Sequence, residues 1–154
     1  MTTPVTIRIQ SADFDIAAEI AALTRGNTDI CAVVSFSGIC RGGEGAQAIA
    51  AMTLEHYPGM AEAEIGRHVS EAIARWPLTG VTVIHRYGRV VPGDNIVLVL
   101  TASVHREAAF QAAEFLMDYL KTNAPFWKSE ERADSKVWVD AQAHDDNAAA
   151  RWKK

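Results

Sequence analysis

The chain has 154 residues, of which 49% are hydrophobic and 22% charged, with 15 Lys and Arg against 19 Asp and Glu for a net charge of −4. This composition is typical of a soluble globular protein, and the length predicts one domain over residues 1–154 with a polar tail from about residue 143. The negative net charge argues against nucleic acid as a partner, because non-specific binding to it requires a basic face.

Two features of the sequence bear on the compartment. The two cysteines, Cys31 and Cys40, are too few for a disulfide framework, which favours a reducing environment. Residues 1–10 lack the positively charged segment and apolar stretch of a secretion signal, and no apolar run approaches the roughly 18 residues that span a bilayer. We therefore expect a cytoplasmic protein with no membrane partner.

The spacing of apolar residues predicts the elements in chain order. A strand over 5–10 precedes a helix over 14–23, with Ser11 or Asp13 as its cap, and the nearly all-apolar segment 30–39 predicts a buried strand. Further strands are predicted over 49–57, 81–87, 96–104, 126–129 and 136–139, and further helices over 61–76 and 105–121. This order lacks the regular alternation of a doubly wound sheet. The expected fold class is therefore α+β, with a mainly antiparallel sheet and about three helices.

No motif for a nucleotide, for structural zinc or for thiol redox chemistry is present. The histidines, which also carry metal sites in many proteins, never recur at the four-residue spacing that places two ligands on one helix face. They are His56, His68, His85, His105 and His144. We expect no metal site and no cofactor.

Two lysines flank a rigid aromatic turn and are the first candidates for chemistry. Lys121 closes the long helix, and Lys128 follows Ala124-Pro125-Phe126-Trp127. Two nearby ammonium groups beside apolar rings lower each other's pKa, which would make one amine a nucleophile or proton shuttle while the other binds an anion. The alternative is structural: Lys121 complements the helix dipole, and Lys128 is a solvated strand residue.

Three further residues could bind an anion. His105 and Arg106 begin the long helix, where free backbone N–H groups favour a phosphate and the guanidinium adds a forked donor. Arg41 precedes Gly42-Gly43, which could form a backbone anion nest. A capping histidine and surface arginines are the alternative interpretation for all three.

Several strings of the sequence together resemble the large, catalytic subunit of molybdopterin synthase. They occur in the same order over about residues 29 to 140 and read Phe36-Ser37-Gly38-Ile39-Cys40-Arg41, Leu54-Glu55-His56-Tyr57-Pro58-Gly59-Met60, Val83-Ile84-His85-Arg86-Tyr87-Gly88, Pro92-Gly93-Asp94, Ser103-Val104-His105-Arg106, Met117-Asp118-Tyr119-Leu120-Lys121 and Ala124-Pro125-Phe126-Trp127-Lys128-Ser129-Glu130. The agreement of so many long strings makes the resemblance specific to this family.

The resemblance implies a fold of the α/β-hammerhead type and a homodimer within a heterotetramer. It also implies a partner, a small ubiquitin-like sulfur-carrier subunit whose C-terminal Gly-Gly thiocarboxylate enters the active site. The substrate would be cyclic pyranopterin monophosphate, known as precursor Z. A transferase of this family moves two sulfurs to that substrate and forms the dithiolene of molybdopterin, a step in molybdenum cofactor biosynthesis.

The resemblance also assigns site residues by position. Lys121 and Lys128 match the active-site lysines, whose individual roles could be exchanged. The matching anion and pterin pocket and its neighbours are Arg41, His105, Arg106, Glu130 and Phe36. The chain departs from the family in the loop 41–46, where an Arg-x-x-Asn pattern is expected, and at Gln142, where many relatives carry an arginine.

Helix geometry adds a constraint on this assignment. His105 and Lys121 lie sixteen residues apart on one predicted helix, hence about 24 Å apart at 1.5 Å per residue. One small pterin cannot touch both ends, so a single pocket requires the helix start of a second protomer. Two other functions stay open. A non-catalytic module could dock the carrier or an anionic metabolite through the same basic cluster, and an RNA-binding α+β domain is disfavoured by the net charge.

Overall fold

The computed structural model describes residues 2–45, 48–132, 136–139 and 143–153, whose strands form two four-stranded sheets. The first sheet has the order β1-β4-β6-β2, formed by β1 (Val5–Gln10), β4 (Leu78–Arg86), β6 (Asn95–Ser103) and β2 (Ala32–Ile39). The second has the order β5-β3-β7-β8, formed by β5 (Gly88–Val90), β3 (Ile49–His56), β7 (Phe126–Arg132) and β8 (Lys136–Val139). The expected α+β class and mainly antiparallel pairing are confirmed, since β1 with β4 is the parallel pair among the described strands.

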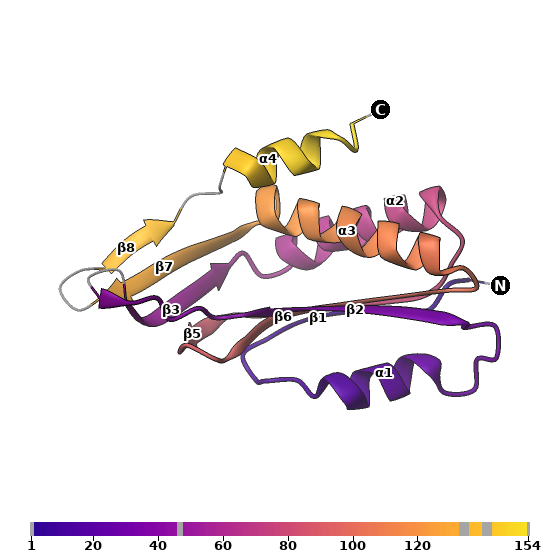
Figure 1. Cartoon of the computed structure of the whole chain (residues 1–154), viewed down its shortest axis with the longest axis horizontal. Helices are drawn as coiled ribbons and strands as arrows, with labels where there is room; N and C mark the ends of the chain where they lie inside the picture. The colour runs from indigo at the N-terminus through magenta and orange to yellow at the C-terminus, as the bar shows by residue number, and fades with distance from the viewer. Residues whose placement is uncertain (1, 46–47, 133–135, 140–142, 154) are drawn as a thin grey trace.

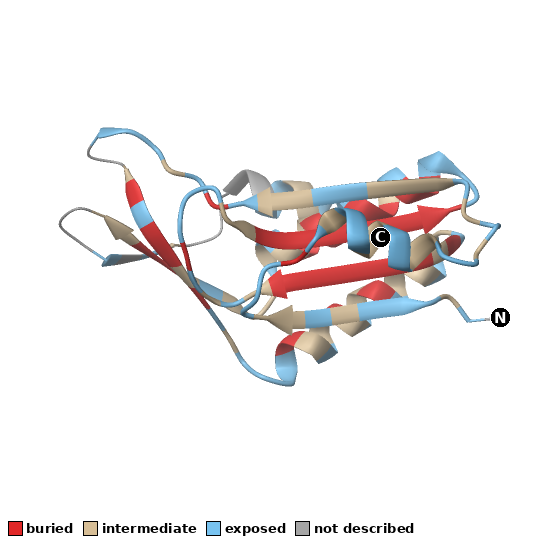
Figure 2. Cartoon of the chain, turned by 90° about the horizontal axis from the view of Figure 1, so that it is seen from below, coloured by how far each residue is buried: buried red, intermediate tan, exposed pale blue. Residues whose placement is uncertain are grey.

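Helices cover both faces of the first sheet (Figure 1). The helix α1 (Ile16–Thr24) lies on one face, and α2 (Met60–Arg75) and α3 (Arg106–Thr122) lie on the other, with α4 (Ala143–Ala150) packed on α3. The middle strands β4 and β6 are therefore buried on both sides, whereas the outer strands are partly exposed (Figure 2). Alternation along β4 sends Val81 and Val83 toward the core under α2 and α3, and sends Ile84 toward α1.

The structure corrects two of the sequence expectations. The segment 30–39 forms β2, but this strand lies at a sheet edge and none of its residues is fully buried. An apolar run indicates that a segment forms a strand, but it does not show whether both faces of that strand are covered. Asp15, rather than Ser11 or Asp13, caps α1, because its carboxylate accepts from the Ala18 N–H at 3.0 Å.

Two elements were missed by the sequence analysis. The three-residue strand β5 is too short to show a period, and it forms by pairing with β3. The expected polar tail contains α4, which gives four helices rather than three among the described residues. Its alanines and aspartates carry no amphipathic pattern, so the helix depends on tertiary contacts.

The segment after α4 anchors it to the core through Trp152. The Trp152 ring meets the rings of Trp76 and Phe115 edge to face, with both centroid distances 5.6 Å. Its indole N–H donates to Asp118 on α3. This contact fixes the chain end against the same helix that carries Lys121.

We expect Trp152→Ala to lower the free energy of unfolding by about 2 kcal/mol, since it removes two aromatic contacts and a hydrogen bond from a half-buried position. Trp138→Ala is the matched control, because Trp138 is 59% exposed on β8, and it should change stability by less than about 0.5 kcal/mol. Urea denaturation followed by circular dichroism measures both. Equal losses in the two variants would contradict the anchoring role of Trp152.

Candidate functional site

A cavity of about 410 Å³ opens where the C-terminal end of α3 meets β7 and the loop after β2. Charged side chains from three separate segments reach it, and the rest of the wall is largely apolar. The charged or titratable lining residues are Cys40, Arg41, His85, Lys121, Lys128 and Glu130. The cavity therefore has the mixed character of a small-molecule site, with a few convergent polar groups in an apolar wall.

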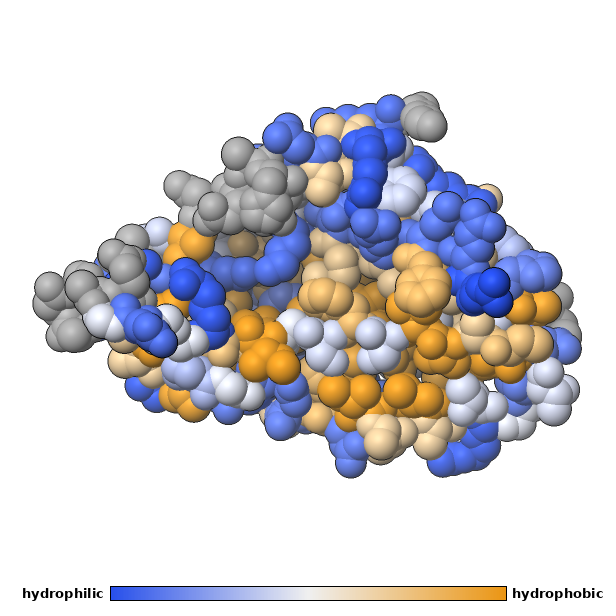
Figure 3. All heavy atoms as spheres, viewed as in Figure 1, coloured by the Kyte–Doolittle hydropathy of each residue, from blue (hydrophilic) through white to orange (hydrophobic). Residues whose placement is uncertain are grey.

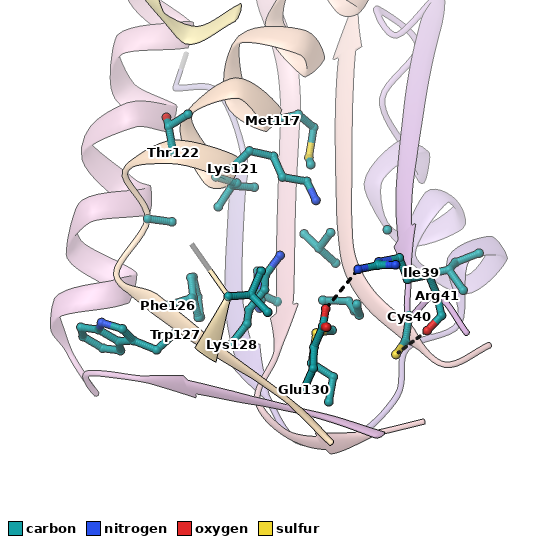
Figure 4. Close-up of a pocket in the computed structure, with 18 of the residues that line it drawn as sticks. Ile39, Cys40, Arg41, Met117, Lys121, Thr122, Phe126, Trp127, Lys128 and Glu130 are labelled. Carbon is teal, nitrogen blue, oxygen red and sulfur yellow. Dashed lines mark hydrogen bonds and ion pairs between the residues drawn. The ribbon is translucent and has the colours of Figure 1, made fainter. Parts of the chain in front are cut away.

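Both candidate lysines point into this cavity (Figure 4). Lys121 lies in the last turn of α3, which ends at Thr122, and β7 begins at Phe126. The intervening turn is closed by the Phe126 N–H, which donates to the Ala124 carbonyl at 2.8 Å. A turn this short brings two residues seven positions apart into one space, so the lysine pair predicted from the sequence is a feature of the fold.

A buried carboxylate lies beside the lysines. Glu130 is 4% exposed, and its two oxygens accept from different arginines: Arg41 at 3.4 Å and Arg132 at 2.9 Å. Pairing of β7 with β3 places Lys128 opposite Leu54 and Glu130 opposite Met52. Because alternate residues of a strand share a face, Lys128, Glu130 and Arg132 form one row along β7. Glu130 is thus neutralised by two guanidinium groups and holds Arg41 against the cavity.

Cys40 contributes a thiol to the same wall but is held in its neutral form. Burial raises the pKa of the Cys40 thiol, and the nearby Asp94 and Glu130 carboxylates raise it further against the opposing effect of Arg41. The thiolate is the nucleophilic form of cysteine. Cys40 therefore acts as part of the apolar wall rather than as a reactive group.

His85 is the site residue that the sequence analysis missed. It is 5% exposed, and its ring stacks on Phe126 with centroids 3.8 Å apart and planes 13° apart. Burial lowers the pKa of His85 to about 4; its backbone contact with Arg86 opposes this shift, whereas Lys128, Lys121 and His56 add to it. The alternation along β4 could have revealed His85 as a site residue, because it puts residue 85 on the core face with Val81 and Val83.

The structure separates the remaining predicted residues from this cavity. His105 is the N-cap of α3 and Arg106 its first residue, whereas Lys121 lies in the last turn of the same helix. Phe36 is 38% exposed on β2 and is not among the lining residues. Ala46 at the end of the atypical loop and Gln142 lie outside the described residues. Within one chain, then, Arg41, Lys121, Lys128 and Glu130 come together and the other three do not.

In the described part of the chain, no three His, Cys, Asp or Glu side chains are grouped closely enough to hold a metal ion. Two acid–base groups of the cavity have partners within the protein instead: Glu130 pairs with Arg41 and Arg132, and His85 contacts the Arg86 carbonyl. The arrangement suits the binding of an anion and the movement of protons between amines and a bound molecule.

We expect Glu130→Gln to lower the free energy of unfolding by about 1–2 kcal/mol, because two ion pairs lose their buried carboxylate while the guanidinium groups keep partial access to water. Glu131→Gln is the control: it removes a pair with Arg89 at 3.4 Å whose partners are 59% and 35% exposed. Its cost should stay below about 0.5 kcal/mol. Chemical denaturation of both variants at neutral pH tests this, and a Glu130 variant as stable as the wild type would contradict it.

Comparison with known proteins identifies close relatives over nearly the whole chain. The family model described as MoaE protein matches residues 9–123. The molybdopterin synthase catalytic subunit of Mesorhizobium japonicum is 64% identical over 150 residues, covering 96% of this chain and 93% of the relative.

Two solved structures share the fold. The molybdopterin biosynthesis MoaE protein of Burkholderia ambifaria has a TM-score of 0.82 at 50% identity, covering 96% of this chain and 97% of that one. The molybdopterin synthase of Staphylococcus aureus has a TM-score of 0.76 at 25% identity, covering 89% of this chain and 96% of that one.

Proposed function

The chain belongs to the MoaE protein family, and we propose that it is the catalytic subunit of a molybdopterin synthase, whose cavity transfers sulfur to cyclic pyranopterin monophosphate. The sulfur comes from the thiocarboxylated C-terminus of a small carrier subunit, and two transfers build the dithiolene of molybdopterin. The observation that carries the proposal is the convergence of Lys121 and Lys128 in one cavity beside the Arg41–Glu130 pair.

Sulfur transfer from a thiocarboxylate makes three demands on a site. The sulfur must meet an electrophilic carbon of the substrate, the carrier must leave as a carboxylate, and the reacting groups must be shielded from bulk water. A cavity with a largely apolar wall, lined by both amines, contributes to the last of these by limiting the access of water. The amines and Arg41 supply the charge and protons that the other two require.

The roles of the charged residues follow from their positions. Lys121 is the proton-transfer or covalent participant, and Lys128 is the electrostatic stabiliser near the carrier's C-terminus, although the two roles could be exchanged. Arg41 binds the substrate phosphate, and Glu130 orients that guanidinium. Three further residues contact the substrate from a second protomer, because within one chain they lie away from the cavity. They are His105, Arg106 and Phe36.

A homodimer reconciles these contacts with the length of α3. Because His105 and Lys121 stand about 24 Å apart along one helix, the second protomer would supply the helix start. The edge strand β2 presents exposed Phe36 and Ile39, and Figure 3 shows apolar side chains gathered along the face over β2 and α1. Exposed apolar strand edges are normally covered in functional assemblies. With one carrier per site, the assembly is a heterotetramer.

A cytoplasmic location is part of the same proposal, since a thiocarboxylated carrier and free thiols belong to a reducing compartment. Cys31 and Cys40 are both free. In the part of the chain that the structure describes, no helix has the length and apolar character required to cross a bilayer.

The deciding experiment combines this protein with a thiocarboxylated carrier and precursor Z and measures formation of the dithiolene product. Product formation at a rate that depends on all three components supports the proposal. A chain that binds the carrier but forms no product is instead the non-catalytic docking module.

In that assay we expect Lys121→Ala to lower the single-turnover rate by at least about 100-fold, because it removes a group that moves a proton in the reaction. The melting curve should stay near that of the wild type, since the helix face that packs the core is unchanged. Lys136→Ala on β8 is the matched control: it also removes one lysine charge, but Lys136 lies outside the cavity lining. A Lys121 variant with wild-type turnover would end the catalytic assignment.

A site built from two protomers, with the helix start of one and the lysines of the other, makes a separate prediction. It concerns mixtures of two inactive variants, Arg106→Ala and Lys121→Ala. In a mixed dimer one pocket draws its helix start and its lysine from intact positions, while the other carries both defects. Random exchange makes about half the dimers mixed, so activity should recover to a ceiling of about a quarter of the wild-type value. Labelled protein verifies exchange. Proven exchange without recovery would mean that each site is built within one chain.

A further inference from the structure

We propose that His85 is a positioning residue of this centre, a neutral hydrogen-bond acceptor whose Nε2 holds the Lys128 ammonium in place during sulfur transfer. Its effect on turnover rests on the proposed function, whereas the contact itself can be tested without it. His85 is buried, lines the cavity and has no part in the mechanism derived above.

The position of the ring brings it next to Lys128. His85 stacks on Phe126 with centroids 3.8 Å apart, and Phe126 and Lys128 occupy alternate positions of β7. Both side chains therefore leave the same face of the strand, about 7 Å apart along it. A flexible lysine stem spans that distance, so its amine can reach the imidazole by rotation about its own torsions.

The hydrogen bonding of the ring fixes which nitrogen is available. His85 Nδ1 lies 2.7 Å from the Arg86 carbonyl oxygen, which can only accept, so Nδ1 carries the hydrogen. The lone pair of the neutral ring is then on Nε2. Within the described ranges, no hydrogen bond to Nε2 is formed. The ring thus brings an unused acceptor to the cavity wall.

The imidazole acts as an acceptor and not as a base. With a pKa of about 4, only about one ring in a thousand is protonated at neutral pH, and so weak a base cannot take a proton from an ammonium group. The carboxylate of the cavity, Glu130, is already engaged by Arg41 and Arg132. A neutral acceptor fixes the lysine without adding the negative charge that would oppose an incoming thiocarboxylate.

Two substitutions at this position separate the acceptor from the ring. His85→Phe keeps a flat ring against Phe126 but removes the acceptor, and we expect it to lower kcat about tenfold with KM for the carrier changed less than about twofold. His85→Gln places a carboxamide oxygen near the position of Nε2 and should recover at least about a third of the wild-type rate.

His68 provides a matched control elsewhere in the molecule. Its Nδ1 also faces a backbone carbonyl, that of Glu64 at 3.1 Å, and its ring stacks on Tyr119 with centroids 3.3 Å apart. It lines a different cavity, between α2 and α3. His68→Phe should therefore leave the turnover rate unchanged, which separates the loss of an acceptor at the site from the general cost of replacing a stacked histidine.

A second measurement reads the contact directly. The free protein is treated with an acylating reagent, and mass spectrometry follows the modification rate of each lysine. Loss of the acceptor in His85→Phe should raise the rate at Lys128 about threefold, because an ammonium stabilised by a hydrogen bond gives up its proton less readily, while the exposed Lys136 stays unchanged.

The outcomes distinguish this proposal from the function on which it rests. Wild-type turnover in His85→Phe, or an equal loss in His85→Gln and His85→Phe, would overturn the acceptor role. Unaltered acylation of Lys128 in His85→Phe would overturn the contact. A wild-type protein that transfers no sulfur would refute the proposed function, and the acylation rates would still decide whether His85 holds Lys128.

Discussion

The pairing of β7 with β3 is the constraint on which the candidate site depends. It fixes the register in which Lys128 lies opposite Leu54 and Glu130 opposite Met52, and the alternation of the strand then turns both charged residues to the same side. A slip of one residue would point the whole row away from the cavity. The order of the second sheet, with β7 between β3 and β8, protects this register because β7 is paired along both edges.

The same strand determines the electrostatics of the site. Glu130 would be costly to bury alone, and its two arginines come from quite different places: Arg132 from two positions along β7 and Arg41 from the loop after β2. The carboxylate therefore ties the loop after the first sheet's edge strand to the second sheet. An arginine held in this way loses less freedom when an anion binds, and it has less tendency to fold away from the cavity.

The sequence predicted the parts of this arrangement that are local. The lysine pair could be anticipated because its members lie only seven positions apart across one proline-containing turn, and the strands and helices around it follow from apolar spacing. The Arg41–Glu130 ion pair joins residues 89 positions apart and depends on sheet register, which no local pattern contains. Its two members entered the analysis separately, Arg41 from a glycine-rich loop and Glu130 through family resemblance.

The failures have equally specific causes. An apolar run such as 30–39 looks the same in a central strand and in an edge strand, so β2 was wrongly expected to be buried. His85 occupies a core position in an alternating strand, where a histidine has the same period as its valine neighbours and no motif marks it. The helix α4 has no amphipathic face of its own and is held by Trp152, a contact that becomes visible only when the chain end is placed against α3.

The length of α3 links the fold to the assembly. A helix that packs along β6 and β2 must be about as long as the strands it covers, and this separates its two charged ends by more than one small substrate can bridge. The basic residues at the start of α3 can then take part in sulfur transfer only in the cavity of a neighbouring copy of the chain. A chain with an uncovered apolar edge at β2 has a physical reason to associate in the same way. The helix that builds the core thus also makes a single protomer insufficient for the proposed reaction.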